Sequence, residues 1–242
     1  VLTGLLCASG GLIAAWKVAG TDPAESKPWR WFWLAMLVIN LLGLLATQSR
    51  GPMLMFVVGI LVFVGIERRR IIPAVVASGL TVGAYFGLLT LASAGQEAAV
   101  DLLRRGSTGR LEIYGWFFKQ MSGWEALFGR GMATTATVAE EEFGWFIHHP
   151  HSVYLTQFYL TGLAGAFLLA VLLASGLLAA MKLALAGESL WLALLAGAGA
   201  ALLIDGGHAF SVFSVARLDV FLLAVPAAMA VGRVRGREVR DP

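Results

Sequence analysis

Charged residues are scarce in this chain of 242 residues. They make up 14% of the sequence, whereas soluble proteins carry about 25%. Hydrophobic residues account for 58%, and they are gathered into long apolar runs. This pattern argues against a soluble globular domain and favours a helical protein that crosses a membrane several times.

Cysteine and several common catalytic signatures are also missing. The chain has one cysteine, Cys7, so no internal disulfide can form. The sequence contains no phosphate-binding loop, no GxGxxG after a strand and no G-x-S-x-G elbow. The basic residues flank apolar runs, so nucleic-acid binding is not expected. In Phe128–Gly131 the pattern GxG occurs alone and indicates only a turn.

Seven apolar segments can cross a hydrocarbon core about 30 Å thick, for which roughly 20 helical residues suffice. Lipid offers the backbone no hydrogen-bond partners, and these runs are too continuous for barrel strands, so we expect helices. The predicted fold is an all-α, polytopic membrane helical bundle in which small residues, as in 197–200, allow close helix approach. The expected spans are Val1–Ala19, Trp31–Thr47, Pro52–Ile66, Ile71–Ser93, Val153–Ala174, Leu190–Ile204 and Phe210–Val231.

The chain begins at Val1 inside an apolar run and without a methionine. Its first segment has no basic n-region and no cleavage site of small residues, so we interpret it as a span and not as a signal peptide. We expect either that a leading part is missing or that the chain is a processed product.

Basic residues indicate the orientation. Placing Glu67–Arg70 in the cytoplasm puts eleven of the 18 basic residues on that side. The aromatic run Trp29–Trp33 then fits an interfacial belt at the cytoplasmic entry of span two. We expect spans one to four in residues 1–93, a large, partly helical periplasmic loop with the active-site residues in 94–152, and spans five to seven with a cytoplasmic tail in 153–242.

Two arginines on the predicted outer side are candidates for binding phosphate. Arg50 lies in the hairpin 47–52 between spans two and three, where Gly51 and Pro52 are expected to form the turn. Arg110 lies in a segment, 107–116, that is typical of a short helix, and Tyr114 shares its face at i, i+4. Guanidinium groups bind phosphate oxygens bidentately and stay charged. The alternative for each arginine is interfacial snorkelling or a lipid-headgroup contact.

A third arginine, Arg217, lies with Asp219 inside predicted span seven. Charge is costly inside a membrane and often functional there. Arg217 is therefore either a substrate-binding residue or one half of a structural ion pair with an acidic neighbour.

Three of the four histidines fall in 148–151, at the outer start of span five. An imidazole has an ordinary pKa of about 6.5, so His151 is a candidate general base for a sugar hydroxyl. A metal site with His149 is the rival interpretation. However, Pro150 separates the two histidines, no cysteine is near, and the acidic run Glu140–Glu142 is typical of a solvated loop. We expect neither a metal nor a cofactor. The remaining alternative is that these histidines are only interfacial or buried hydrogen-bonding residues.

Taken together, these elements resemble the O-antigen ligase and polymerase superfamily of bacterial envelope proteins. The resemblance covers roughly Leu34 to Val171, and one position departs from it, since the family often has asparagine where this chain has Ser152. The matching segments occur in the family's order: Ser49–Gly51 opening a span, Gly109–Arg110 followed by Trp116, Leu127–Gly131, His149–Leu155 and Gly162–Gly165.

The resemblance implies a GT-C-like glycosyltransferase membrane fold and an inverting, metal-independent glycosyl transfer on the outer face of the inner membrane. The donor would be a glycan on undecaprenyl pyrophosphate. His151 would activate the acceptor hydroxyl, and Arg50 and Arg110 would hold the pyrophosphate. We expect Tyr114, His149 and Arg217 to contribute to substrate binding. Family members usually have around a dozen spans, which implies that several spans are absent from this chain.

The acceptor is left open by the sequence. We favour an O-antigen ligase that acts on lipid A–core, and the alternatives are an O-antigen polymerase and a protein O-oligosaccharyltransferase. A transporter of a lipid or anion would predict charged or broken helices at the bilayer midplane, whereas the polar residues here cluster on one face. A structural scaffold would not require the histidine and arginine residues.

Overall fold

The computed structural model describes residues 2–20, 27–67, 71–92, 110–131, 150–204 and 218–238, and within these ranges the chain forms helices and turns, with no strand. The all-α membrane bundle predicted from the sequence is confirmed. The helices are α1 (Leu2–Gly20), α2 (Lys27–Ala46), α3 (Arg50–Glu67), α4 (Ile72–Ala92), α6 (Arg110–Lys119), α7 (Trp124–Phe128), α9 (Val153–Leu185), α10 (Leu190–Ile204) and α11 (Leu218–Glu238).

Each of the seven predicted spans overlaps one of these helices. Four of them, in α1, α2, α3 and α9, are long and apolar enough to cross a membrane, and α4 and α10 include shorter apolar helices. The start predicted for span seven, Phe210, lies outside the described residues. The count of seven crossings stays a prediction, as does the compartment that each end faces.

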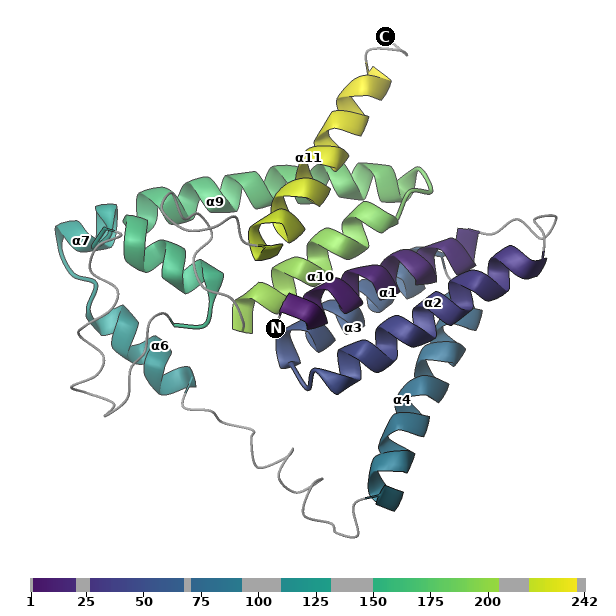
Figure 1. The fold of residues 1–242 in the computed structure, drawn as a ribbon. Helices are drawn as coiled ribbons and strands as arrows, with labels where there is room; N and C mark the ends of the chain where they lie inside the picture. Colours follow the sequence, from purple (N-terminus) through teal and green to yellow (C-terminus); the bar gives the residue numbers. More distant parts are fainter. Residues whose placement is uncertain are drawn as a thin grey trace.

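Small residues let the central helices approach one another closely. α3 packs along α10, and α1 packs along α2 and α3 (Figure 1). At Gly59 of α3, an added Cβ would lie 2.5 Å from a methyl group of Leu12, and at Gly197 of α10 it would lie 2.5 Å from the carbonyl oxygen of Met55. The side chains of Leu12 and Met55 are fully buried between these helices. Glycine therefore sets the helix separation in the core, as the run 197–200 predicted.

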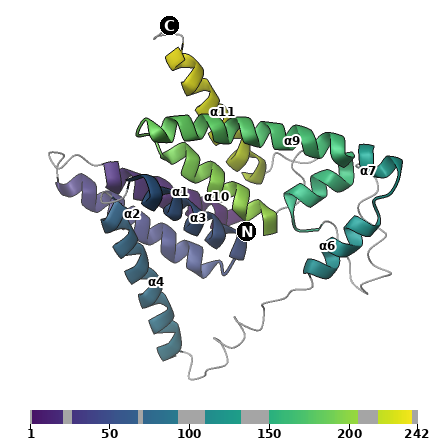
Figure 2. The same ribbon diagram turned by 180° about the vertical axis from the view of Figure 1, so that it is seen from behind.

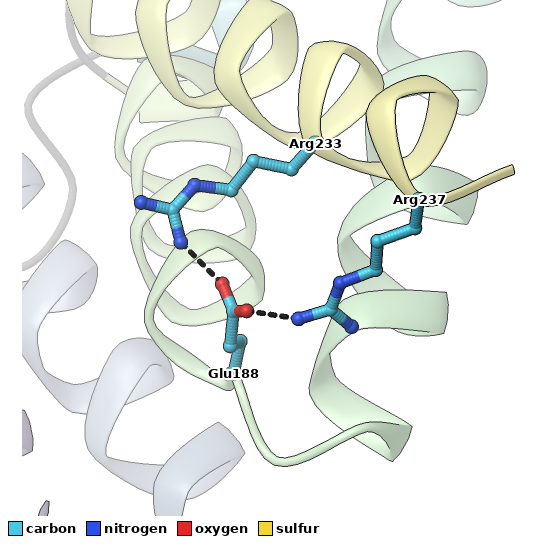
Figure 3. A network of polar contacts seen from close by, with 3 residues as sticks. All are labelled: Glu188, Arg233 and Arg237. Atoms are coloured by element: carbon cyan, nitrogen blue, oxygen red, sulfur yellow. Dashed lines mark hydrogen bonds and ion pairs between the residues drawn. The ribbon is translucent and has the colours of Figure 1, made fainter. Parts of the chain in front are cut away.

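Polar contacts join three elements at one end of the bundle (Figure 3). Glu188, in the turn between α9 and α10, accepts hydrogen bonds from Arg233 and Arg237 of α11. The buried hydroxyl of Ser189 donates to Glu67 at the end of α3, over 2.7 Å. These carboxylates lie beside the start of α10, where the helix dipole favours negative charge. The charged ends that the sequence assigns to one face of the membrane are thus neighbours in space.

The longest helix departs from its prediction in two ways. The helix extends beyond the predicted end of span five at Ala174, because α9 runs over 33 residues from Val153 to Leu185. Gly176 does not interrupt it, since this glycine packs against Ala227 of α11. α9 is also kinked at Gly162, which has φ 63° and ψ −163°. The kink divides α9 into a first segment, 153–161, and a long segment, 163–185. We did not predict this kink from the sequence.

Gly197→Ala is expected to lower stability, because the new methyl group meets the backbone of Met55 and forces α3 and α10 apart. We expect a loss of about 1–3 kcal/mol, which is typical of overpacking. The measurement is the thermal unfolding midpoint in detergent micelles. Gly65→Ala on α3 is the control, because no atom lies within 4 Å of its added Cβ, and alanine favours a helix by about 1 kcal/mol over glycine. Equal midpoints for the two variants would contradict the close α3–α10 contact.

Candidate active site

Arg50 is the first residue of α3 and is partly buried. The turn before it is held by the hydroxyl of Thr47, which donates to the carbonyl of Leu44 over 2.7 Å, and by Gln48 in the left-handed region with φ 48°. The prediction that Gly51 and Pro52 form this turn is wrong, because both residues lie buried inside the first turn of α3. Proline is tolerated there because the first helical N–H groups have no partner within the helix. Arg50 therefore stands at a helix N-terminus, where the dipole already favours an anion.

Arg110 occupies the same position on α6, as its first described residue. The predicted helix is confirmed, and Tyr114 lies one turn further along it. The hydroxyl of Tyr114 donates to the carbonyl oxygen of Leu203, in the last turn of α10, over 3.2 Å. Next to Tyr114 on α6, Ile113 and Phe117 are buried in a cluster with Leu155, Tyr159 and Leu160 of α9. α6 is thereby held between the end of α10 and the first segment of α9.

His151 directly precedes α9, as the sequence predicts, between the buried Pro150 and the N-cap residue Ser152. The Ser152 hydroxyl accepts a hydrogen bond from the backbone N–H of Leu155 over 3.4 Å. His151 itself has φ 55°, a left-handed conformation that costs residues other than glycine roughly 1–2 kcal/mol. Such strain is retained where surrounding structure enforces it, and it is concentrated at functional sites. The local backbone therefore gives His151 a defined orientation at the helix start.

Tyr154 ties the histidine segment to the same end of α10. Its hydroxyl donates to the carbonyl oxygen of Gly199 over 2.9 Å. Gly199 and Leu203, which accept from Tyr154 and Tyr114, are four residues apart, so the two carbonyls lie about one helical turn, ~6 Å, from each other. We did not identify Tyr154 from the sequence, because its partner is 45 residues away. The local sequence does not single out Tyr154, because Thr156, Tyr159 and Thr161 in the same segment also carry hydroxyl groups.

α10 is thus the common contact of the three elements that carry candidate residues. It packs along α3, which begins at Arg50, and against α9, which His151 precedes. It receives the hydrogen bond of Tyr114 from α6, which begins at Arg110. The three segments lie far apart in the sequence, and α10 brings them to one end of the bundle (Figure 1).

A second contact holds the segment after α7 against the kink of α9. The backbone N–H groups of Arg130 and Gly131 donate to the carbonyl oxygens of Tyr159 and Leu160, over 2.9 and 3.0 Å. A Cβ on Gly129 would lie 2.2 Å from the Leu160 carbonyl oxygen, and a Cβ on Gly162 would lie 2.3 Å from the carbonyl carbon of Leu127. We call this pair of close backbone contacts, made by Gly129 with residues 160–161 and by Gly162 with residues 127–128, the glycine interlock. The GxG that the sequence indicated only as a turn is therefore a docking element.

The side chain of Arg130 completes this contact. Its Nε lies 3.1 Å from a carboxylate oxygen of Glu125, and a terminal nitrogen donates to the side-chain oxygen of Gln120 over 3.2 Å. Its guanidinium carbon lies 6.0 Å from the centre of the Tyr159 ring. Hydrogen bonding to Tyr159, and next to Glu125, raises the pKa of Arg130 despite an opposing effect of burial. Arg130 thus acts as a permanently charged link between α6, α7 and α9.

Two predicted site residues, His149 and Arg217, lie outside the described residues, as do Glu140–Glu142. The roles of His149 and Arg217 in substrate binding stay predictions. Within the part of the chain that the structure describes, no three histidine, cysteine, aspartate or glutamate side chains are grouped closely enough to hold a metal ion.

Comparison with known proteins identifies one family. A family model described as O-antigen ligase matches residues 35–170, which is more than half of the chain. The matched range includes Arg50, Arg110, Tyr114 and His151, together with both glycines of the interlock. No curated protein and no solved structure matches the chain significantly.

Gly129→Ala should release the segment after α7 from α9, because the added methyl group overlaps the backbone of Leu160. Gly131→Ala is the matched control: its φ of 77° is close to the 78° of Gly129, but its added Cβ meets nothing within 4 Å. Alanine meets a positive φ in both variants, and only at Gly129 does the new methyl group also overlap a facing backbone. The measurement is hydrogen exchange of peptides covering 124–131 and 155–162, which should accelerate in Gly129→Ala only. Equal exchange in the two variants would show that the interlock is absent.

Tyr154→Phe should loosen the end of α10 by removing the hydrogen bond to Gly199. The expected cost is about 0.5–1.5 kcal/mol, seen as faster hydrogen exchange in residues 199–204. Tyr85→Phe is the control, because the Tyr85 hydroxyl donates to Leu45 between α4 and α2, away from α10. If Tyr154→Phe leaves exchange in α10 at the wild-type rate, the proposed attachment of the histidine segment is wrong.

Proposed function

The chain belongs to the O-antigen ligase family, and we propose that it transfers a glycan from undecaprenyl pyrophosphate to lipid A–core at the periplasmic face of the bacterial inner membrane. The observation that carries the proposal is the attachment of two segments to one end of α10. Tyr154 attaches the segment of His151, and Tyr114 attaches the helix of Arg110. α10 also packs along the helix that begins with Arg50. A base and two cations on converging segments are the groups that this transfer requires.

The proposed reaction displaces a pyrophosphate from the anomeric carbon of the donor. The acceptor hydroxyl oxygen forms a bond to that carbon, while the bond from the carbon to the pyrophosphate oxygen breaks with inversion. The hydroxyl proton passes to the imidazole of His151, and undecaprenyl pyrophosphate leaves with the bonding electrons. General base catalysis of this kind contributes about 10²–10⁴ in rate.

In this proposal Arg50 and Arg110 bind the pyrophosphate and stabilise the charge that grows on it as the bond breaks. Each stands at the first described position of a helix, so the helix dipole adds to the positive charge of the guanidinium group. The leaving group is already an anion, so two fixed cations are able to serve in place of a metal ion. Tyr114, His149 and Arg217 are proposed to contribute further contacts to the substrates.

The strained backbone of His151 supports a chemical role for this residue. A residue that only filled space at the start of α9 would be glycine at the least conformational cost, because glycine adopts positive φ freely. A transporter is disfavoured for a different reason, namely that the candidate polar residues gather at one end of the bundle. The polymerase and the protein oligosaccharyltransferase share the proposed chemistry and differ in the acceptor.

His151→Asn is expected to stop transfer while the protein stays folded. Asparagine tolerates the left-handed backbone at this position but cannot accept the proton, so the rate should fall about a hundredfold or more. The assay uses the full-length protein in liposomes, a glycan linked to a polyprenyl pyrophosphate as donor, and a chelator of divalent metal ions. Lipid A–core, the glycan repeat unit and a pilin-like protein are offered separately, and the productive acceptor distinguishes ligase, polymerase and protein transferase.

The matched control is Gln48→Asn, at the other described position where a residue other than glycine has positive φ. It changes a left-handed turn residue near Arg50 without removing a proposed catalytic group, so full activity is expected. Wild-type activity in a folded His151→Asn protein would overturn the assignment of the base. Loss of wild-type transfer in chelator, restored by a divalent metal ion, would overturn the metal-independent mechanism.

A further inference from the structure

The helices α6 and α7 expose a set of large apolar side chains. On α7, Trp124 is 76% exposed and Phe128 is 64% exposed, and their rings stack with centroids 5.9 Å apart. On α6, Leu111 is 83% exposed and Phe118 is 57% exposed. These two residues are seven positions apart and so share one helix face. Large apolar side chains exposed in such number usually mark a site of contact with a membrane or with another protein.

The length of α9 places this surface at the edge of the membrane. Lys182 marks the charged end of α9, and Gly162 lies twenty residues before it. Twenty helical residues rise about 30 Å, which equals the thickness of the hydrocarbon core. The glycine interlock holds the end of α7 against Gly162, and both views of the molecule place α7 beside this part of α9 (Figures 1 and 2). α7 therefore lies at the level where hydrocarbon meets headgroups.

The exposed residues also continue a lipid-facing surface along α9. Just past the kink, Leu163, Phe167 and Leu168 are each more than half exposed on a helix that spans the membrane. Phe118 of α6 reaches the same helix, with its ring 5.7 Å from that of Phe158. On α6, the polar residues Glu112 and Lys119 each follow directly after one of the apolar pair. Charged side chains therefore border the exposed apolar pair, as is found where a surface passes from lipid to water.

We propose that Leu111, Phe118, Trp124 and Phe128 form a lipid-facing platform that inserts among the phospholipids of the outer leaflet. The platform is a membrane contact made by the loop itself, separate from the spans. Its aromatic rings sit at headgroup depth, where amphipathic and aromatic side chains are favoured. Arg110 and Tyr114 lie on α6, so the platform also determines how far these two residues stand from the membrane surface.

The test measures contact with lipid directly and does not depend on glycan transfer. Single cysteines are introduced in the full chain on a Cys7→Ser background, spin-labelled, and studied in phospholipid vesicles. Collision with oxygen, which concentrates in lipid, is compared with collision with a water-soluble nickel chelate. Labels at Trp124→Cys and Leu111→Cys should show an oxygen-to-nickel ratio several-fold above that at Glu112→Cys. Leu178→Cys, on an exposed position of α9, gives the value for full lipid contact.

A label at position 124 that the nickel chelate reaches as freely as it reaches position 112 would overturn the proposal, since that face would be in water. A label shielded from both reagents would also overturn it, since protein would then cover the face. A second measurement uses a substitution that keeps the fold unchanged. Brominated phospholipids should quench the tryptophan fluorescence of the wild type more than that of Trp124→Phe. Equal fractional quenching in the two proteins would contradict insertion of Trp124.

Discussion

The glycine interlock is the contact on which the arrangement of α6, α7 and the kinked end of α9 depends. Gly129 faces the backbone of Leu160, and Gly162 faces the backbone of Leu127. The N–H groups of Arg130 and Gly131 bond the carbonyl oxygens of Tyr159 and Leu160, just before the kink of α9. Any side chain at either glycine would overlap the facing backbone. The same contact fixes α7 against α9, and Arg130 extends it to α6 through Gln120. One kinked helix thus connects the membrane bundle with the helical part of the loop.

Two sets of contacts, one with α9 and one with α10, position the residues that we propose for catalysis. The interlock and the buried ring of Phe117, packed on Tyr159, hold α6 against α9. Tyr114 attaches α6, and Tyr154 attaches the start of α9, to successive turns of α10, which itself packs on α3. A glycosyl transfer from a lipid-linked donor needs such a connection, because the donor's tail stays in the bilayer while its pyrophosphate lies at the surface. The two arginines and the histidine base must then be held at the same distance from the membrane, and helices that are attached to the spans hold them there.

Much of this fold follows from local sequence. Lipid leaves a spanning segment no hydrogen-bond partner outside its own helix, so the apolar runs had to be helical. The segment 107–116 predicted a helix on which Arg110 and Tyr114 share a face, and the polar residues before Val153 predicted the position of His151 at a helix start. The kink at Gly162, the continuation of α9 to Leu185 and the bond of Tyr154 were not predictable in this way. Each depends on a partner far away in the sequence, namely Leu127, Ala227 and Gly199.

The most direct test of the central claim is a structure of the full-length protein bound to a non-transferable analogue of a polyprenyl-pyrophosphate-linked glycan. The account predicts direct contacts from the guanidinium groups of Arg50 and Arg110 to the pyrophosphate oxygens. It also predicts the imidazole of His151 on the face of the anomeric carbon opposite to the pyrophosphate, where the acceptor hydroxyl enters. A pyrophosphate bound away from both arginines, or a His151 side chain turned away from the anomeric carbon, would contradict it.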